Sequence, residues 1–476
     1  MAEYYQNPLW GRYASEEMQK IYSPDHKFIT WRKLWIALAE SERALGLPIS
    51  EEQIEELRRH RDSIDYDAVA RYEKELRHDV MAHIHAYADQ CPKAAPILHL
   101  GATSSYVGDN TDLLTLRESL ELIRVRLVAV IRALAVFAEK QKDQAILAYT
   151  HYQAAQPTTL GKRACMWLQD LIEDLDQLEY RIARIPFFGC KGATGTAASF
   201  LSLFDGDAEK VHALEKRIAH EFGFTEVLPI SGQTYPRKVD YFALSVLSGI
   251  AQSISKMATD IRLMSHDKVV DEPFEQKQVG SSAMPYKRNP MRCERMVSLA
   301  RLVIHTAENT PDTSVNQWLE RTLDDSANRR IVLAEAFLGT DGILRLAENV
   351  VSGLVVYPRR AERMLREELP FIASENILMH AVERGGNRQE LHEVIRMASQ
   401  EAAYRVKERG EDNPLLEILA ADPRFEMTRE DFADILNTGK FVGLAPQQTE
   451  DFLQNRVRPL LAEYTNICSE HSEIEV

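Results

Sequence analysis

The sequence predicts an all-α protein built around a long helical bundle. Three observations support this fold class. Apolar residues recur at threes and fours over several long stretches, some stretches are apolar on more than one side, and strand signals are weak throughout. The clearest stretch runs from Thr111 to Gln141, about eight turns of helix, with Asn110 or Thr111 as the expected cap. Helices of this length favour a central bundle shared between subunits.

The remaining elements divide into three units. An N-terminal domain over residues 1–103 is expected to hold shorter helices, and it ends near Cys91-Pro92-Lys93 and Gly101. The central domain covers residues 104–356, and the C-terminal domain begins near Tyr357-Pro358 and covers 357–476. We expect helices over residues 29–45, 51–63 and 67–90, then over 111–141, 158–185, 236–266, 289–306 and 326–354, and finally over 361–368, 377–384, 388–408, 415–420, 429–436 and 447–463.

Composition excludes several classes of protein. Of 476 residues, 45% are hydrophobic and 27% charged, as in globular proteins, and the net charge of −15 disfavours a nucleic-acid partner. The chain lacks an apolar run of about 18 residues and a recognisable signal peptide, so we expect no membrane partner and a cytoplasmic location. The five cysteines are odd in number and lack a Cys-x-x-Cys pair, which predicts reduced thiols and no zinc site.

The segment from Gly280 to Pro290 is the strongest chemical signal. It reads Gly-Ser-Ser-Ala-Met-Pro-Tyr-Lys-Arg-Asn-Pro and sets a fixed cation, Lys287, within a few residues of Ser281 and Ser282. A serine hydroxyl becomes a useful base only where a cation or oriented N–H groups stabilise the alkoxide. Asn289 and Pro290 are expected at the N-cap and first position of the next helix, whose positive end would add to this field. An ordinary Gly/Ser/Pro loop is the alternative.

This segment resembles the Gly-Ser-Ser-x-Met-x-x-Lys-x-Asn motif of the fumarase/aspartase superfamily, whose members eliminate fumarate from a succinyl adduct. Within that superfamily it is similar to the adenylosuccinate lyase family. Four other segments agree, in the family's order: His-Leu-Gly-Ala-Thr-Ser-Ser-Tyr-Val-Gly-Asp-Asn from His99, Thr-His-Tyr-Gln-Ala-Ala-Gln-Pro from Thr150, Lys-Gly-Ala-Thr-Gly-Thr from Lys191, and Arg-Thr-Leu-Asp-Asp-Ser-Ala-Asn-Arg-Arg from Arg321.

The resemblance implies a fold, an assembly and an activity. The fold is a three-domain, fumarase/aspartase-like one whose long central bundle forms a homotetramer core, with each active site shared by three subunits. The activity is elimination of fumarate from adenylosuccinate, giving AMP, and from SAICAR, giving AICAR, without a cofactor. Two alternatives stay open: another lyase of the superfamily, such as argininosuccinate lyase, fumarase or a cycloisomerase, or a non-catalytic structural protein of the lens type.

The same resemblance implies a role for each matched residue. His151 is the general acid, Ser281 the general base, and Lys287, Glu294 and His78 support them. The substrate carries a phosphate and two succinyl carboxylates, for which bidentate arginines are well suited. The implied substrate-binding residues are Arg12 and Tyr13 at the phosphate end; Arg77, His78 and Asp79 near the leaving group; Thr103 and Ser104 at a succinyl carboxylate; and Gln233, Lys287, Arg295, Arg321, Ser326 and Arg330.

Three nearby histidines raise the question of a metal site. On one helix His78 and His85 would lie two turns apart and His83 on another side, so no compact i, i+4 pair forms and a metal is not expected. We interpret His83 and His85 as packing or surface residues. His99 is interpreted as structural.

The spacing around Arg321 predicts a helix boundary. Ser326 and Arg330 are four residues apart and share a helical face, whereas Arg321 and Arg330 would lie about half a turn apart on one straight helix. For all three to contact one ligand, a break is needed near Leu323 to Asp325. Asp324 or Asp325 is the expected cap of the helix that follows.

Overall fold

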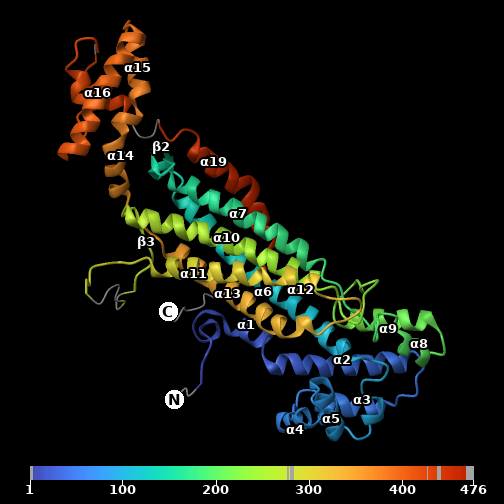
Figure 1. Ribbon diagram of the computed structural model, residues 1–476. Helices are drawn as coiled ribbons and strands as arrows, with labels where there is room; N and C mark the ends of the chain where they lie inside the picture. Colours follow the sequence, from blue (N-terminus) through green and yellow to red (C-terminus); the bar gives the residue numbers. More distant parts are fainter. Residues whose placement is uncertain (1–3, 276–277, 279–282, 426, 437–440, 468–476) are drawn as a thin grey trace.

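The computed structural model describes residues 4–275, 278, 283–425, 427–436 and 441–467. It confirms the all-α prediction: long helices run side by side, with a smaller helical group at each end (Figure 1). The bundle consists of α6 (Ser104–Lys140), α7 (Leu160–Ile182), α10 (Lys238–His266), α11 (Met291–Ala307) and α13 (Asp324–Gly353). These are the five long helices that periodicity predicts.

The start of α6 differs from the expectation. The helix begins at Ser104, so neither Asn110 nor Thr111 caps it. Asn110 is instead buried within the helix, where its amide nitrogen donates to the Gly189 carbonyl at 3.1 Å and its oxygen accepts from the Phe188 N–H at 3.0 Å. A side chain typical of helix caps here holds a distant loop against the bundle.

One end of the bundle carries the N-terminal helices. A π-turn (Leu9–Tyr13) and α1 (Glu16–Ile21) lead to α2 (Pro24–Ala44), followed by α3 (Glu51–His60) and a short 3₁₀ helix (Ala95–Ile97). The single helix expected over residues 67–90 is wrong, because Arg77 adopts a left-handed backbone (φ 56°) that separates α4 (Tyr66–Leu76) from α5 (Asp79–Gln90). Two short helices, α8 (Ala198–Leu203) and α9 (Ala208–Glu221), lie beside α2 (Figure 1).

The other end carries the helices that follow the bundle. In chain order these are α14 (Pro358–Ile372), α15 (Ser374–Glu383), α16 (Arg388–Arg409), α17 (Leu415–Ala420) and α18 (Arg429–Ile435), which have a hydrophobic core of their own around Ile377, Leu391 and Leu419. The chain then returns to α7 through α19 (Ala445–Phe452), a π-turn (Leu453–Val457) and α20 (Arg458–Glu463). Leu453 and Val457 belong to the bundle core.

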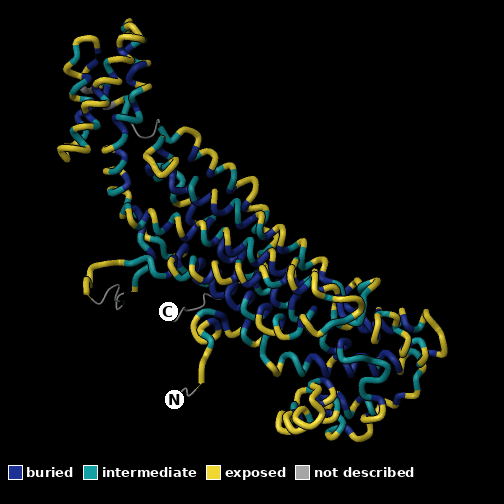
Figure 2. The backbone as a smooth tube through the Cα atoms, in the orientation of Figure 1, coloured by how far each residue is buried: buried dark blue, intermediate teal, exposed yellow. Residues whose placement is uncertain are grey.

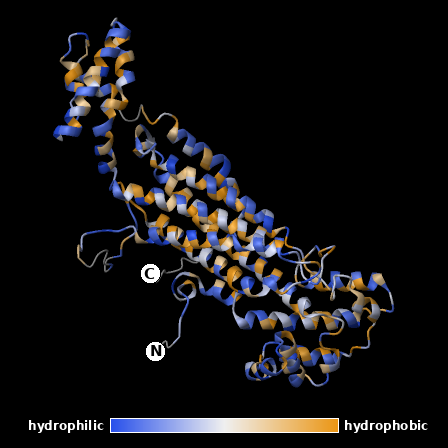
Figure 3. Cartoon of the chain, viewed as in Figure 1, coloured by the Kyte–Doolittle hydropathy of each residue, from blue (hydrophilic) through white to orange (hydrophobic). Residues whose placement is uncertain are grey.

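Burial explains why the bundle helices are long and only partly amphipathic. The interior of the bundle is buried along its whole length (Figure 2), and hydrophobic and hydrophilic residues alternate along each helix (Figure 3). α12 (Asn309–Val315) closes the bundle between α11 and α13. The domain boundaries at residues 103 and 356 stay a prediction.

Two small antiparallel pairs interrupt the helical architecture. β1 (Ala145–Thr150) pairs with β2 (Gln153–Thr159), and β3 (Val270–Asp271) pairs with β4 (Val355–Val356). Thr150 faces Gln153 across the first pair, so His151 and Tyr152 form a two-residue turn, and both have positive φ (51° and 57°). This backbone is typical of a type I′ hairpin turn.

Candidate functional site

A cavity of about 830 Å³ lies where α2, the start of α5, the N-terminal part of α6 as far as Leu116, the segment before α10 and the start of α13 meet. It brings together side chains that are distant in the sequence, from Ile21 to Ala334, 313 positions apart. Of the residues predicted to bind substrate, the cavity is lined by Arg77, His78, Asp79, Thr103, Ser104, Gln233, Arg321, Ser326 and Arg330.

The left-handed Arg77 sets the position of His78. Because α4 ends at Arg77, His78 becomes the N-cap of α5 and its Nδ1 accepts the Met81 N–H at 3.3 Å. In the neutral imidazole the proton then lies on Nε2. That nitrogen lies 3.3 Å from Ser104 Oγ, in the first turn of α6, so the two predicted residues already form a pair.

The start of α13 confirms the predicted break. The helix begins at Asp324, which leaves Arg321 outside it and Ser326 and Arg330 on its first two turns. The expected cap is wrong, since the N-cap is Leu323 and no side chain caps the helix. The Asp325 carboxylate instead accepts from Arg321 Nη1 at 3.0 and 3.1 Å.

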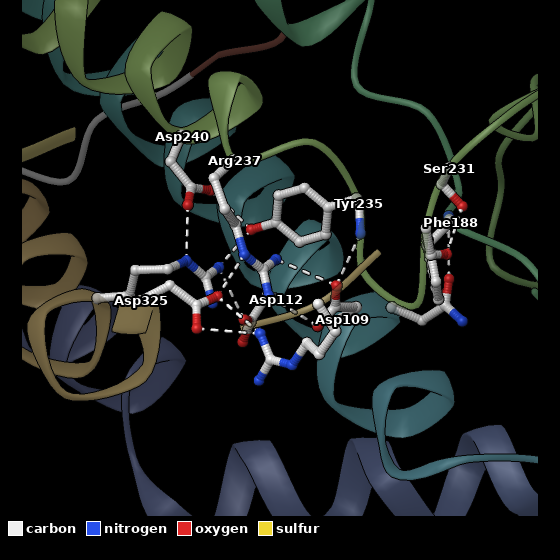
Figure 4. Close-up of polar contacts among 12 residues, drawn as sticks. Asp109, Asp112, Phe188, Ser231, Tyr235, Arg237, Asp240 and Asp325 are labelled. Atoms are coloured by element: carbon white, nitrogen blue, oxygen red, sulfur yellow. Dashed lines mark hydrogen bonds and ion pairs between the residues drawn. The ribbon is translucent and has the colours of Figure 1, made fainter. Parts of the chain in front are cut away.

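A buried ion network lies beneath the cavity (Figure 4). Arg237 donates to Asp325 Oδ2 at 2.6 Å and to both oxygens of Asp109, at 3.1 and 3.3 Å. Arg329 donates to Asp240 at 2.7 Å and to Asp112 at 2.9 Å. Tyr235 joins the two halves, because its backbone N–H donates to Asp109 at 2.8 Å, while its hydroxyl donates to Asp240 at 2.6 Å and accepts from Arg329.

Sequence reasoning missed this network. Its members are Asp109, Asp112, Tyr235, Arg237, Asp240, Asp325 and Arg329. One signal in the sequence could have revealed it: charged residues at helix positions whose neighbours on the same face are apolar. Carboxylates and guanidinium groups at such positions are buried in the bundle and must be paired. Burial raises the pKa of the Asp109 carboxyl, and the Arg237 guanidinium opposes that effect.

The network fixes three of the bundle elements relative to each other. It links α6, the segment before α10, and α13, which are the elements that carry Ser104, Gln233 and Ser326. The Gln233 N–H also donates to the Glu320 carbonyl at 2.9 Å, and Gly232 is needed there because a Cβ would lie 2.5 Å from the same oxygen. The cavity wall is therefore rigid on this side.

The predicted acid lies elsewhere. His151 is exposed at the tip of the β1–β2 hairpin, and Tyr149 anchors the hairpin by donating its hydroxyl to Asp267 at 2.8 Å, directly after α10 ends. α10 has 29 residues, which at about 1.5 Å per residue spans about 43 Å. Because Arg237 and Asp240 lie at its other end, the hairpin and the cavity of this chain are at opposite ends of the bundle (Figure 1).

The segment around the predicted base is only partly described. Ser281 lies outside the described residues, and Lys287 is exposed. α11 begins at Met291, so Asn289 is not its cap. Glu272, which precedes α11 by nearly twenty residues, caps the helix instead, because its carboxylate accepts the N–H groups of Arg292 at 3.0 Å and Cys293 at 2.6 Å.

Four other predicted residues also lie away from the cavity. Glu294 and Arg295 are in the first turns of α11, and Glu294 is exposed. Arg12 and Tyr13 are in the π-turn near the middle of α13, where the Tyr13 carbonyl accepts from Arg345 at 2.9 Å.

The other three histidines considered in the sequence, His83, His85 and His99, contact aromatic side chains. His83 is buried and stacks on Phe28, and burial lowers its pKa to about 4. His85 stacks on Tyr72, and His99 accepts the indole N–H of Trp35 at 2.9 Å. Within the described residues no group of three or more His, Cys, Asp or Glu side chains has the arrangement of a metal site.

No helix among the described residues is both long enough and apolar enough to cross a membrane.

Comparisons with known proteins agree with this fold and with the sequence motifs. Residues 15–304, more than half of the chain, match the family model described as Lyase, so the protein belongs to the lyase class. Residues 370–452 match the model described as adenylosuccinate lyase C-terminus.

The adenylosuccinate lyase of Saccharomyces cerevisiae is 50% identical over 461 residues, covering 96% of this chain and 95% of that one. The adenylosuccinate lyase of Schistosoma mansoni is 48% identical over 476 residues, covering 100% and 99%. The chain belongs to the adenylosuccinate lyase family.

Solved structures support the fold alone. A fumarate lyase from Mesorhizobium sp. BNC1 superposes with a TM-score of 0.79 at 24% identity, covering 95% of this chain and 100% of that one. A 3-carboxy-cis,cis-muconate lactonizing enzyme from Pseudomonas putida superposes with a TM-score of 0.82 at 22% identity, covering 95% and 99%.

Proposed function

We propose that the protein eliminates fumarate from adenylosuccinate, giving AMP, and from SAICAR, giving AICAR, in the cytoplasm. The cavity carries this proposal, because it gathers nine of the residues that the motifs associate with a phosphorylated, dicarboxylic substrate. Arginine pairs well with phosphate and carboxylate groups, and Thr103 and Ser104 offer hydroxyls beside them. Gln233 and His78 add neutral donors.

The chemistry requires two groups that act in opposite senses. A base removes a proton from the carbon beta to the leaving nitrogen, the electron pair forms the fumarate double bond, and an acid protonates the nitrogen as the carbon–nitrogen bond breaks. We assign the base to Ser281, with Lys287 stabilising its alkoxide, and the acid to His151, with Glu294 favouring its protonated form. His78 supports the reaction from the cavity, held by Met81 and Ser104.

We propose further that the working site is shared by three subunits of a homotetramer. Within one chain, the length of α10 separates the hairpin from the cavity, so the His151 that acts at a given cavity must come from another chain. The bundle helices also expose apolar side chains that a second copy would cover, namely Tyr241, Leu263, Leu302 and Ile331. A neighbouring subunit would likewise supply three more of the predicted residues to the cavity, namely Lys287, Glu294 and Arg295.

Turnover tests the proposal directly. The purified protein is given adenylosuccinate, and absorbance is followed while fumarate is measured independently. We expect AMP and fumarate in equal amounts, and no fumarate from argininosuccinate. Fumarate released from argininosuccinate alone would assign the protein to a different reaction, and inertness toward adenylosuccinate at every enzyme concentration would refute the proposal.

A further inference from the structure

Lys27, which no motif singles out, lines the cavity and forms no ion pair with a carboxylate of the described residues. Most cations of the cavity wall are already neutralised from within the protein. Arg237 and Arg329 are held in the buried network, Arg321 contacts Asp325, and Arg330 Nη2 lies 3.3 Å from Asp79 Oδ2. An anionic ligand gains less from such paired groups than from an unpaired one.

The Lys27 ammonium is held in place by aromatic rings. Its Nζ lies 5.1 Å from the centre of the Trp31 ring, one turn further along α2, and 5.4 Å from the centre of the Phe28 ring. Trp31 lines the same cavity. Cation–π contact at these distances orients the ammonium without neutralising its charge.

The acidic groups that influence Lys27 are all farther away than an ion pair. Asp112, Asp79 and Glu73 act on it electrostatically, but none of the carboxylates in the described parts of the chain lies within 4.0 Å of Nζ. Asp112 and Asp79 are already paired with Arg329 and Arg330. Burial lowers the pKa of the Lys27 ammonium, because a partly buried ammonium loses some of its hydration.

We propose that Lys27 is a further substrate-binding residue, whose ammonium contacts an oxyanion group of the ligand in the cavity. The partner is either the phosphate or a succinyl carboxylate, and both satisfy the same requirement for an anion close to Nζ. This inference rests on the proposed function for the identity of the ligand. The position of the ammonium in the cavity wall does not depend on that identity.

The test compares Lys27→Met with Lys27→Arg. Methionine keeps an unbranched apolar stem that can pack on Trp31 and Phe28 but carries no charge. We expect Lys27→Met to raise the KM for adenylosuccinate roughly ten- to hundredfold, whereas Lys27→Arg stays within a fewfold of the parent. Lys33→Met is the matched control, because Lys33 is exposed on the same helix and does not line the cavity.

A second substrate identifies the group that Lys27 meets. Succinyladenosine is adenylosuccinate without its phosphate. If Lys27 binds the phosphate, the effect of Lys27→Met on KM disappears with succinyladenosine; if it binds a carboxylate, the effect is seen with both substrates. An unchanged KM for both substrates in Lys27→Met overturns the inference, as does an equal rise in Lys33→Met. Lys27→Gln replaces the methionine variant if that protein does not fold.

The two proposals fail in different ways. If the unaltered protein releases no fumarate from adenylosuccinate, the proposed function fails, and Lys27 is then tested by calorimetric titration with inorganic phosphate and, separately, with succinate. Saturable binding of either anion that Lys27→Met weakens about tenfold supports the role of Lys27. Titrations with both anions that are the same in the two proteins, with or without binding, contradict it.

Discussion

Arg237 Nε donates to Asp325 Oδ2 at 2.6 Å, although the two residues are 88 positions apart in the sequence. This bond ties the segment before α10 to the first turn of α13, and Asp325 also accepts from Arg321. Both partners are almost fully buried. The pair therefore couples the stability of the bundle to the position of a predicted ligand-binding arginine.

Loss of this carboxylate should be costly. Asp325→Ala leaves the buried Arg237 guanidinium with one carboxylate partner among the described residues, Asp109, and we expect the free energy of unfolding to fall by about 3–5 kcal/mol. Removal of the exposed Glu367, which pairs with Arg363, should cost less than about 1 kcal/mol. Thermal and urea unfolding of Asp325→Ala and Glu367→Ala measure both values. Similar losses of unfolding free energy in the two variants would show that the buried network stabilises the protein no more than an exposed ion pair does.

The hairpin anchor predicts an effect on rate. Tyr149 lies two residues before His151, and Tyr149→Phe removes the hydroxyl that holds the β1–β2 hairpin to Asp267. We expect kcat to fall about tenfold with little change in KM, because the acid is then less well positioned. Tyr464→Phe is a matched control, since Tyr464 is also half-buried and donates to a carboxylate, Glu179, at 2.8 Å. It should lower stability by a similar amount, about 1 kcal/mol, and leave kcat unchanged.

Subunit mixing tests the shared site. His151→Ala and Ser281→Ala are each expected to be inactive, but equal amounts exchanged into hybrid tetramers should recover about a quarter of the parent activity, because a site needs one intact residue from each of two chains. Differently tagged subunits establish that exchange has occurred. Mixing His151→Ala with the double variant should recover nothing. Hybrids that remain inactive after proven exchange would argue that both residues act from one chain.

Glu42 predicts a dependence of stability on pH. Its side chain is fully buried in α2, and both carboxyl oxygens lack a hydrogen-bond partner among the described residues, so burial raises its pKa to about 8. The unfolded value is about 4.3. Between these values the folded protein keeps a proton that the unfolded chain releases, so the stability contributed by the proton is lost as pH rises from about 4.5 to 8.

Glu42→Gln should remove that dependence. We expect the variant to match the parent near pH 5 and to be more stable at pH 8 by on the order of 2–4 kcal/mol. Unfolding midpoints at both pH values measure the difference. The exposed Glu367→Gln should shift stability equally at the two pH values, and a Glu42→Gln protein that is no more stable than the parent at pH 8 would show that the Glu42 carboxyl is ionised when folded.

Local regularities were predictable from the sequence. The five bundle helices follow from apolar spacing, and the boundary before Ser326 follows from the need to direct Arg321 and Arg330 to one ligand. Both arguments use contacts or angles within one helix, where periodicity is reliable. The helix caps were less predictable, because Asn110 and Asp325 are polar residues whose partners lie in distant segments.

Backbone conformation set the limit of prediction elsewhere. Arg77 interrupts a helical pattern with a left-handed residue that is not glycine, and His151 and Tyr152 form a hairpin turn without the usual Asn-Gly. The buried network depends on pairs such as Asp109 and Arg237, 128 positions apart. No local pattern specifies which distant charge will meet which.

The length of α10 affects when a newly made chain becomes catalytically active. A monomer released from the ribosome would carry a complete cavity and a complete hairpin at opposite ends of a rod, and neither could reach the other. With a site shared between subunits as proposed above, activity requires an encounter with sister chains, so specific activity is expected to decline on dilution as the assembly dissociates, even while every individual chain stays folded.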